Sequence, residues 1–380
     1  MPADILIFAE DPGAANYVAA LPDALRIRGW TVKLLAEGYA KDYLSRRGVG
    51  VEVVEEGLQA SDLLRREHPR LLIVGTSENL DTLGLKLCLE ARVMGIRSLG
   101  VVDALGNAPY RFRGQSDDSL FYAPDWLAVP DSWTREAYAS LGYPVERVMI
   151  CGHPQYDHIL EVGAGIAGEG RKGVRKRLFP SMGGELPLVV FAAEISAGIR
   201  PQQYYELSDD YTLSGRGKSV GRTEIVLEEF LDALAAAACH AYRVLRLHPK
   251  NDPDEFKRYA EEFDYVSQNE PPYHLIYAAD LVVGMSSILL FEAALMGTPT
   301  LSVLPRTTEK ESVIGVLAGI TPCVTTREQL ISILPGLLSG ETHPPRLGSD
   351  VVVKGSTGRV VDLVEELLVP DSDSRFILND

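Results

Sequence analysis

The chain has 380 residues, 46% of them hydrophobic and 24% charged, which is enough for two or three domains with cores of their own. These proportions exclude wholesale disorder, collagen-like repeats and coiled coil. The formal charge of -16 opposes nonspecific attraction to nucleic acid or anionic lipid, so no nucleic-acid partner is expected.

The cysteines and the apolar segments indicate the compartment. The four cysteines lie far apart without a Cys-x-x-Cys pair, which predicts neither a disulfide framework nor a metal site. The first residues lack the basic start and long apolar segment of a secretion signal, and no apolar stretch reaches the ~18 to 20 residues of a membrane span. We therefore expect a soluble, cytoplasmic protein. Peripheral membrane contact has no support in the sequence, and no pattern predicts an oligomeric state.

In the first half, short apolar runs alternate with helical patterns, which is typical of parallel strands covered by helices on both faces. The predicted strands span residues 5–9, 31–36, 51–54, 71–75, 98–102, 126–129 and 148–151. One helix is predicted to begin at the turn Asp11-Pro12-Gly13 and to end at Gly29. Further helices are predicted over residues 39–47, 61–67 and 80–94.

The second half repeats this rhythm after a change of composition at residues 161–187, where glycines and a basic run interrupt the series. Strands are predicted at 188–192, 242–247, 281–284 and 300–303, and helices at 223–238, 253–262 and 287–296. The sequence thus predicts an α/β protein with two tandem Rossmann-like, doubly wound domains, 1–160 and 188–380, joined by a linker at 161–187. Ligands of such domains bind at the carboxyl ends of the strands, so we expect function in an interdomain cleft.

One connection is much longer than the short loops that usually join strands and helices in compact domains. Residues 197–222 are rich in turn formers and aromatic side chains. Loops of this length inside a compact domain are usually functional or disordered. A mobile lid and an unstructured insertion both remain open at this point.

The segment Arg246-Leu247-His248-Pro249-Lys250 follows a buried strand. Proline stops the strand and bars an immediate helix, which leaves His248 at the carboxyl edge of the sheet. By itself, a histidine before proline is more often a structural loop residue than a ligand.

Two serines, Ser286 and Ser287, stand where the next predicted strand gives way to a helix. Hydroxyls, free backbone N–H groups and the positive end of the helix dipole converge there, which favours an anion. Glu292 lies about a turn and a half further on, where its carboxylate can accept hydrogen bonds from ribose hydroxyls. The alternatives are that Ser286 is only an N-cap and that Glu292 is only a solvated helix residue.

The order of these elements, a His-Pro element followed by a Ser-Ser element and a Glu-Ala-Ala segment, resembles the GT-B superfamily of glycosyltransferases and sugar-nucleotide epimerases. The pairing of the His-Pro and Ser-Ser elements resembles the donor site of bacterial transferases that use CMP- or CDP-activated donors. By resemblance, His248 contacts the nucleotide, Ser286 and Ser287 hold its phosphate, and Glu292 binds ribose as in enzymes with UDP-linked donors. The paired glycines of the usual phosphate loop of hydrolysing UDP-GlcNAc 2-epimerases are missing.

In the N-terminal half, Glu10 and Asp11 follow the first strand, and Gly13 permits close approach to the helix that begins there. The two carboxylates are candidate catalytic groups. The alternative is that Asp11 only caps the helix.

Asp103 directly follows the 98–102 strand, with Arg111 and Arg113 shortly after it. An aspartate at that edge can deprotonate an acceptor hydroxyl, and the arginines can hold an anionic acceptor. The alternative is a structural ion pair between Asp103 and one of the arginines.

Glu194 follows the first strand of the second half, and Ser196, Gly198 and Arg200 come soon after it. This placement predicts that they approach the diphosphate or the sugar. His153, in the Gly152–Asp157 stretch after the last strand of the first half, is predicted to be structural.

The resemblance implies a metal-independent GT-B transferase in glycan or glycoconjugate biosynthesis, with a nucleotide-sugar donor on the second domain and a glycan or small-molecule acceptor on the first. It moves a sugar or polyol-phosphate group without a cofactor. Asp11, Asp103 or Glu10 supplies the base, and His248, Lys250, Arg246, Ser286, Ser287, Glu292 and Glu194 bind the donor. Alternatives are a hydrolysing sugar-nucleotide 2-epimerase and a noncatalytic sugar-nucleotide-binding scaffold.

Overall fold

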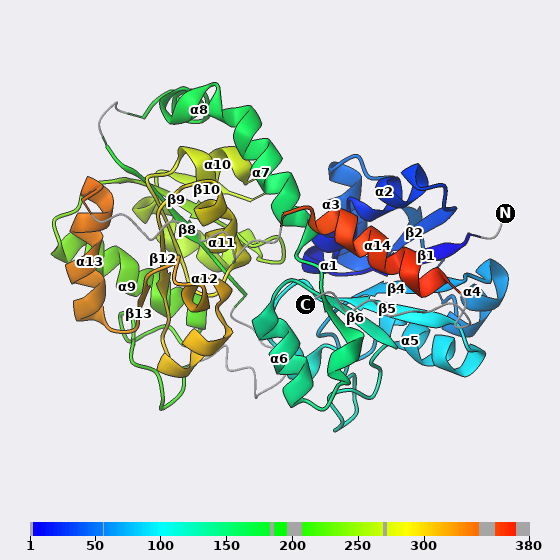
Figure 1. Ribbon diagram of the computed structural model, residues 1–380. Coiled ribbons are helices and arrows are strands. Elements are labelled where there is room, and N and C mark those ends of the chain that lie inside the picture. Colours follow the sequence, from blue (N-terminus) through cyan, green and yellow to red (C-terminus); the bar gives the residue numbers. More distant parts are fainter. Residues whose placement is uncertain are drawn as a thin grey trace. The chain divides into compact units, whose positions relative to one another are not determined.

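The computed structural model describes residues 3–55, 57–182, 186–195, 207–268, 272–341 and 354–369. The chain divides into two compact units (Figure 1): unit 1 comprises residues 1–157 and 352–380, and unit 2 comprises residues 158–351. Each unit is built on one parallel sheet. No helix within the described ranges has both the length and the apolar character needed to cross a bilayer.

The sheet of unit 1 has seven strands in the order β3-β2-β1-β4-β5-β6-β7. The strands are β1 (Ile5–Ala9), β2 (Val32–Ala36), β3 (Glu52–Val53), β4 (Leu71–Gly75), β5 (Arg97–Val101), β6 (Trp126–Val129) and β7 (Val148–Ile150). The helices are α1 (Pro12–Val18), α2 (Leu21–Ile27), α3 (Gly38–Arg46), α4 (Ala60–Glu67), α5 (Leu83–Met94), α6 (Ser132–Ser140) and α14 (Ser356–Leu368), with short 3-10 turns η1 (Ala108–Tyr110) and η2 (Val145–Arg147). Helix α7 (Pro154–Ala167) begins in unit 1 and continues into unit 2.

The sheet of unit 2 has six strands in the order β10-β9-β8-β11-β12-β13. The strands are β8 (Leu188–Ala192), β9 (Tyr242–Arg246), β10 (Tyr265–Ser267), β11 (Leu281–Gly284), β12 (Thr300–Val303) and β13 (Cys323–Val324). The helices are α8 (Gly170–Leu178), α9 (Arg222–Ala236), α10 (Tyr273–Ala278), α11 (Ile288–Leu295), α12 (Ile314–Leu317) and α13 (Arg327–Ser339), and the 3-10 helices are η4 (Pro253–Glu262) and η5 (Thr307–Ser312).

The central strands of each sheet are buried on both faces. In β1, Ile5 and Ile7 lie in one apolar cluster, while Leu6 and Phe8 lie in another. Because successive side chains of a strand point to opposite faces, two apolar layers require a strand that is apolar at every position. This explains why the central strands are continuous apolar runs in the sequence, and the predicted doubly wound α/β architecture is confirmed.

The two sheets share one topology. Numbering the strands from the first in each unit gives the order 3-2-1-4-5-6 in both, and unit 1 adds a seventh strand. The order reverses between β1 and β4 in unit 1 and between β8 and β11 in unit 2. Ligands of open α/β sheets bind outside the carboxyl ends of the strands at such a switch point. The loops after these four strands are therefore where function is expected.

The C-terminal helix α14 corrects the predicted domain boundaries, because it belongs to unit 1 and not to the second domain. Its buried face, which includes Val360 and Val364, packs into the core beside α2. At its start, Asp157 accepts hydrogen bonds from Gly355 N (2.8 Å) and Thr357 N (3.1 Å). The apolar face of α14 is therefore buried in unit 1, although α14 follows unit 2 in the sequence.

Residues 161–187 are also not the linker that was predicted. They contain the end of α7 and all of α8, and Val174 and Phe179 are buried in the core of unit 2. Arg175, in the basic run of α8, donates to the carbonyl of Ala278 at 2.6 Å and pairs with Asp280 at 2.8 Å. Of the glycines that suggested a linker, Gly163, Gly165, Gly168, Gly170 and Gly173 lie within or between α7 and α8.

Of the long connection at 197–222, for which a lid and an unstructured insertion were both considered, the structure describes residues 207–222. This part is anchored at several points. Thr212 donates to the carbonyl of Pro305 (2.9 Å), the Arg216 amide donates to Glu228 (2.7 Å), and the Gly215 amide donates to Glu229 (2.9 Å). Residues 207–222 therefore form a loop that is hydrogen-bonded to the rest of unit 2 and ends at the start of α9. Ser196, Gly198 and Arg200 lie outside the described residues.

Candidate functional site

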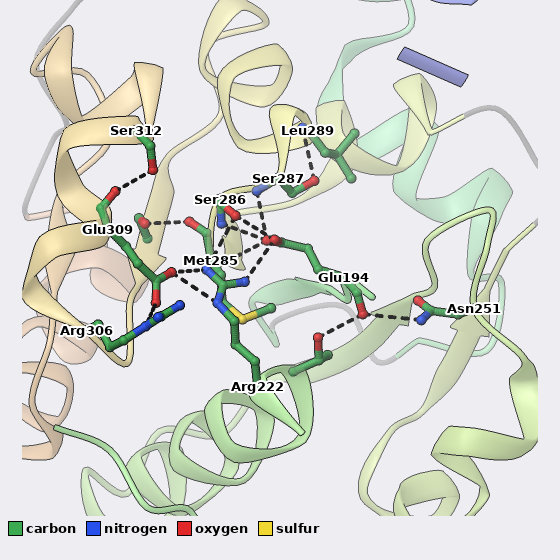
Figure 2. Close-up of polar contacts among 12 residues, drawn as sticks. Glu194, Arg222, Asn251, Met285, Ser286, Ser287, Leu289, Arg306, Glu309 and Ser312 are labelled. Carbon is green, nitrogen blue, oxygen red and sulfur yellow. Dashed lines mark hydrogen bonds and ion pairs between the residues drawn. The ribbon is translucent and has the colours of Figure 1, made fainter. Parts of the chain in front are cut away.

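In unit 2, the carboxylate of Glu194 fills the turn between β11 and α11 (Figure 2). Its Oε1 accepts hydrogen bonds from the backbone amides of Ser286 (2.7 Å), Ser287 (2.8 Å) and Met285 (3.2 Å). Its Oε2 accepts from Ser286 Oγ at 2.7 Å. The turn where an anion was predicted lies at the switch point of the sheet, and in this structure its donors are taken by a carboxylate of the protein itself.

Arg222, the first residue of α9, completes this arrangement. Its Nη1 lies 3.1 Å from Glu194 Oε2, and its Nη2 lies 3.4 Å from Ser286 Oγ. The guanidinium also donates to Glu309, with Nε at 3.1 Å from Oε2. Its side chain is only 4% exposed. Burial lowers the pKa of Arg222, but the two carboxylates raise it by more, so the group stays charged.

Arg306 extends the network from η5 and the loop before it. Its Nε donates to Glu309 Oε1 at 2.8 Å. The chain of contacts thus alternates in charge, with carboxylates at Glu194 and Glu309 and guanidiniums at Arg222 and Arg306 (Figure 2). Buried charges are tolerated when each is paired in this way.

His248, after β9, is linked to the same site through Asn251. The His248 amide donates to Asn251 Oδ1 (2.9 Å), and Asn251 Nδ2 donates to the carbonyl of Glu194 (3.2 Å). The Lys250 amide donates to His248 Nδ1 at 3.1 Å. The neutral imidazole therefore carries its proton on Nε2. The structure brings the turn that contains His248 and Lys250 next to Glu194, as the strand order predicts.

Arg246 and Glu292 were also predicted to bind the donor. Arg246 Nη1 donates to Ser267 Oγ at 2.7 Å, and Ser267 belongs to β10, which lies on the side of β9 away from β8. The cation that contacts Ser286 is Arg222 instead. Glu292 lies in α11 and is almost fully buried, with 4% of the residue exposed.

In unit 1, Glu10 occupies the place after β1 that Glu194 occupies near the end of β8. Its Oε1 accepts a hydrogen bond from Asn79 Nδ2 at 2.8 Å, across the switch point between β1 and β4. Burial raises the pKa of the Glu10 carboxyl, and hydrogen bonds from Ser77 and Asn79 offset only part of that.

Asp103, after β5, forms an ion pair with Arg111, whose Nη1 lies 2.6 Å from Oδ1. Thr76 Oγ1 donates to the same oxygen at 3.2 Å. The other oxygen lies against α1, where a Cβ at Gly13 would come within 2.1 Å of it. The space at Gly13, predicted for a substrate, is taken by Asp103. Arg113 pairs elsewhere, with Asp117 at 3.0 Å.

Glu78 is a site residue that sequence reasoning missed. Asn107 Nδ2 donates to both of its carboxylate oxygens, at 2.9 and 3.0 Å. Burial raises its pKa, while the nearby Arg111 counteracts part of the shift. A carboxylate shortly after the end of β4 could have been noticed by the same rule that selected Asp103 and Glu194. Arg222 and Glu309 gave no comparable signal.

Asp11 is the N-cap residue of α1 by position, with an extended backbone and no side-chain hydrogen bond to the helix. The Asp11 carboxylate therefore does not cap α1 through a hydrogen bond. His153 is buried, with its ring 4.7 Å from that of Tyr17 and 4.9 Å from that of Tyr156. Burial lowers the pKa of His153 to about 4.

Among the described residues, no group of three or more His, Cys, Asp or Glu side chains is arranged to hold a metal ion. The polar clusters of both units are instead built from hydrogen bonds and ion pairs of carboxylates with amides and guanidiniums.

No protein-family model matches the chain, and no curated protein sequence does. Solved structures do match over nearly the whole length. The UDP-GlcNAc 2-epimerase of Neisseria meningitidis, solved with UDP-GlcNAc, has a TM-score of 0.67 at 14% identity, covering 95% of this chain and 99% of that one. The UDP-GlcNAc 2-epimerase of Methanocaldococcus jannaschii, solved with UDP-GlcNAc and UDP, has a TM-score of 0.65 at 14% identity, with the same coverage.

A glycosyltransferase from Rickettsia africae also matches, with a TM-score of 0.57 at 10% identity, covering 97% of this chain and 93% of that one. The chain therefore has the GT-B-like two-domain fold that these epimerases and transferases share. The predicted fold class is confirmed. Identities this low establish the fold, and activity must be argued from the site.

Proposed function

We propose that this protein is an enzyme of nucleotide sugars that transfers a sugar or polyol-phosphate group from a nucleotide-activated donor to an acceptor hydroxyl. One observation carries the proposal. At the switch point of unit 2, the amides of Ser286 and Ser287, the Ser286 hydroxyl and the buried Arg222 converge on a single anionic group. Such a set of donors suits the phosphates of a nucleotide.

Unit 2 binds the nucleotide part in this proposal. The turn of His248 and Lys250 lies next to the phosphate position through Asn251, and Glu292 in α11 remains the proposed ribose contact. When the bond between the transferred group and the phosphate breaks, its electron pair goes to the phosphate oxygen. The α11 amides and Arg222 stabilise that negative charge.

Unit 1 supplies the acid-base chemistry. The acceptor oxygen forms the new bond and loses its proton to a carboxylate, for which Asp103 is the first candidate because the Arg111 ion pair orients it. Asp11 is the second candidate base. Glu10, whose pKa is raised by burial, fits a proton donor better than a base, which revises its proposed role.

A hydrolysing sugar-nucleotide 2-epimerase is the second candidate, and the carboxyls of unit 1 favour it. That reaction needs both an acid and a base near the sugar ring. Burial raises the pKa values of Glu10 and Glu78, while Asp103 is ion-paired. Carboxyls with environments that differ in this way are typical of acid-base pairs. The matched epimerase structures, one with UDP-GlcNAc and another with UDP as well, are a further reason to test it.

Two measurements test the proposal. First, a thermal-shift panel of CMP, CDP, UDP, GDP and ADP identifies the nucleotide, because a ligand that binds only the native state raises the melting temperature. Second, the matching nucleotide sugar is incubated with and without acceptors. A glycosylated acceptor supports the transferase. Free epimerised sugar with released nucleotide, formed without acceptor, supports the epimerase. Binding without turnover indicates a scaffold, and the absence of any nucleotide binding contradicts the whole proposal.

A further inference from the structure

We propose that Glu194 is an internal occupant of the phosphate position in unit 2 and that an incoming phosphate must displace its side chain. This inference rests on the proposed function, since it concerns the same nucleotide site. It assigns Glu194 a role opposite to that of a donor-binding residue. The carboxylate competes with the ligand instead of contacting it.

The first support is that Glu194 uses the donors that a phosphate needs. Its two oxygens accept from three consecutive backbone amides, those of Met285, Ser286 and Ser287, and from the Ser286 hydroxyl. Arg222 adds a charged donor at 3.1 Å. A phosphate oxygen at these amides requires the same positions, so the carboxylate and the phosphate exclude each other.

The second support is that only the side chain has to move. The backbone carbonyl of Glu194 is held by Thr223 Oγ1 (2.8 Å) and Asn251 Nδ2 (3.2 Å), which do not touch the carboxylate. Ser286 is exposed, and 14% of the Glu194 side chain is exposed as well. The carboxylate can therefore rotate toward solvent while the end of β8 stays in place.

The third support is that Arg222 does not lose its partner in the exchange. Its guanidinium also binds Glu309, which in turn binds Arg306 at 2.8 Å (Figure 2). When Glu194 leaves, Arg222 keeps one carboxylate and gains the phosphate. The buried guanidinium charge of Arg222 therefore stays paired throughout the exchange. An unpaired buried charge would be strongly destabilising. A diphosphate, which carries more negative charge than the single carboxylate of Glu194, is favoured in this exchange.

The test compares Glu194→Ala and the isosteric Glu194→Gln with wild-type protein by calorimetric titration with inorganic pyrophosphate and with UDP. Glu229→Gln is the matched control. Glu229 also accepts from two consecutive amides, Ser214 N (3.2 Å) and Gly215 N (2.9 Å), and pairs with an arginine, Arg327. Urea unfolding shows that each variant is folded.

We expect Glu194→Ala to bind both probes at least about tenfold more tightly than wild type, which is about 1.4 kcal/mol. Glu194→Gln gives a smaller gain, because the amide oxygen still accepts but carries no charge. Pyrophosphate also raises the melting temperature of Glu194→Ala more than that of wild type. The control Glu229→Gln binds both probes like wild type.

The outcomes separate the two proposals. If Glu194→Ala gains affinity for pyrophosphate while UDP binds neither protein, the internal occupant stands and the nucleotide proposal fails. If UDP binds wild type and Glu194→Ala equally well, or if pyrophosphate affinity does not rise, the internal occupant is overturned. In that case any UDP binding to wild type still supports the nucleotide site.

Discussion

The two units share one strand order, but the carboxyl group at the switch point has different hydrogen-bond partners in each unit. Glu10 and Glu194 follow the first strand of their sheets, and each reaches the loop after the fourth. The carboxyl of Glu10 accepts from neutral side chains, including Asn79, and burial raises its pKa. The carboxylate of Glu194 accepts from backbone amides and from Arg222. One topology therefore presents a carboxyl with a raised pKa in unit 1 and a carboxylate held by backbone amides and a guanidinium in unit 2.

This contrast divides the chemistry between the units. Unit 1 gathers carboxyls, with Asp103, Glu78 and Glu10 on the loops after β5, β4 and β1. Unit 2 gathers backbone amides and guanidiniums around one carboxylate. A substitution in unit 1 should affect turnover, whereas a substitution in unit 2 should affect nucleotide binding or the stability of the unit.

The largest expected effect comes from removing the candidate base. Asp103→Asn keeps the shape of the side chain but not its proton affinity, so we expect turnover to fall about 100-fold or more. Nucleotide affinity in unit 2 should not change. Steady-state kinetics and calorimetric titration measure the two effects on the same protein.

Asp117→Asn is the control for this substitution. Asp117 also pairs with an arginine of the same loop, Arg113 at 3.0 Å, but its side chain is fully exposed. Turnover should be that of wild type. Normal turnover of Asp103→Asn would remove Asp103 as the base and leave Asp11 as the candidate.

The next effect tests the buried network of unit 2. Arg222→Met leaves Glu194 and Glu309 without their shared cation, and breaking a buried ion pair costs about 3 to 5 kcal/mol of unfolding free energy. Arg216→Met is the comparison, since Arg216 pairs with Asp232 and Glu262 at the surface. It should cost at most about 1 kcal/mol. Urea unfolding of both variants measures the difference. Equal losses of unfolding free energy would show that the buried network of Arg222 stabilises the unit no more than the surface ion pairs of Arg216 do.

A third effect depends on pH and belongs to unit 1. The pKa of His153 falls from 6.5 to about 4 in the folded protein because the ring is buried. Below pH 6.5 the unfolded chain binds a proton that the folded chain does not, so stability is lost as the pH falls from 6.5 toward 4. The loss is on the order of 3 kcal/mol.

His153→Asn should flatten this slope, because its side-chain oxygen can accept from the Gln155 amide as His153 Nδ1 does at 3.1 Å. The exposed His240 provides the control, and His240→Asn should keep the wild-type slope. Urea unfolding at pH values between 4 and 7 makes the comparison. A slope unchanged by His153→Asn would show that other groups cause the acid sensitivity.

The smallest effect compares the two glutamates directly. The raised pKa of Glu10 means that its contribution to stability is complete below pH 4.5 and is lost as the pH rises through the folded value. At pH 7, Glu10→Gln should therefore be as stable as wild type or more stable. Glu194→Gln should be less stable, because charged hydrogen bonds are lost. If both variants change the free energy of unfolding in the same direction, the proposed difference between Glu10 and Glu194 is wrong.

Much of the sheet architecture could be predicted from the sequence. The strands at 5–9, 71–75, 126–129, 188–192, 281–284 and 300–303 have the predicted bounds, because strands buried on both faces are continuous apolar runs. The short strands β10 and β13 were missed, whereas β3 and β7, which are equally short, lie within the predicted strands at 51–54 and 148–151. The single helix predicted from Pro12 is two helices, α1 and α2, and the helix predicted at 253–262 is the 3-10 helix η4.

The candidate site was predictable only in part. Strand order explains why Glu194, Ser286 and the turn of His248 lie together, since they follow neighbouring strands. That Glu194 itself fills the turn depends on side-chain packing and charge pairing between distant segments. Arg222 was missed for the same reason, because nothing near it in sequence shows that two carboxylates will surround it. The position of α14 could not be predicted either, because the sequence does not show which of the two units buries its apolar face.

The most direct test of the account is a titration of ¹⁵N-labelled protein with UDP, followed through the backbone amide signals of Met285, Ser286 and Ser287. These amides exchange a carboxylate for a phosphate if the nucleotide binds where we propose. The account predicts that their signals shift in step with UDP occupancy and that the Asp103→Asn protein behaves in the same way. UDP binding that leaves all three signals in place would contradict it.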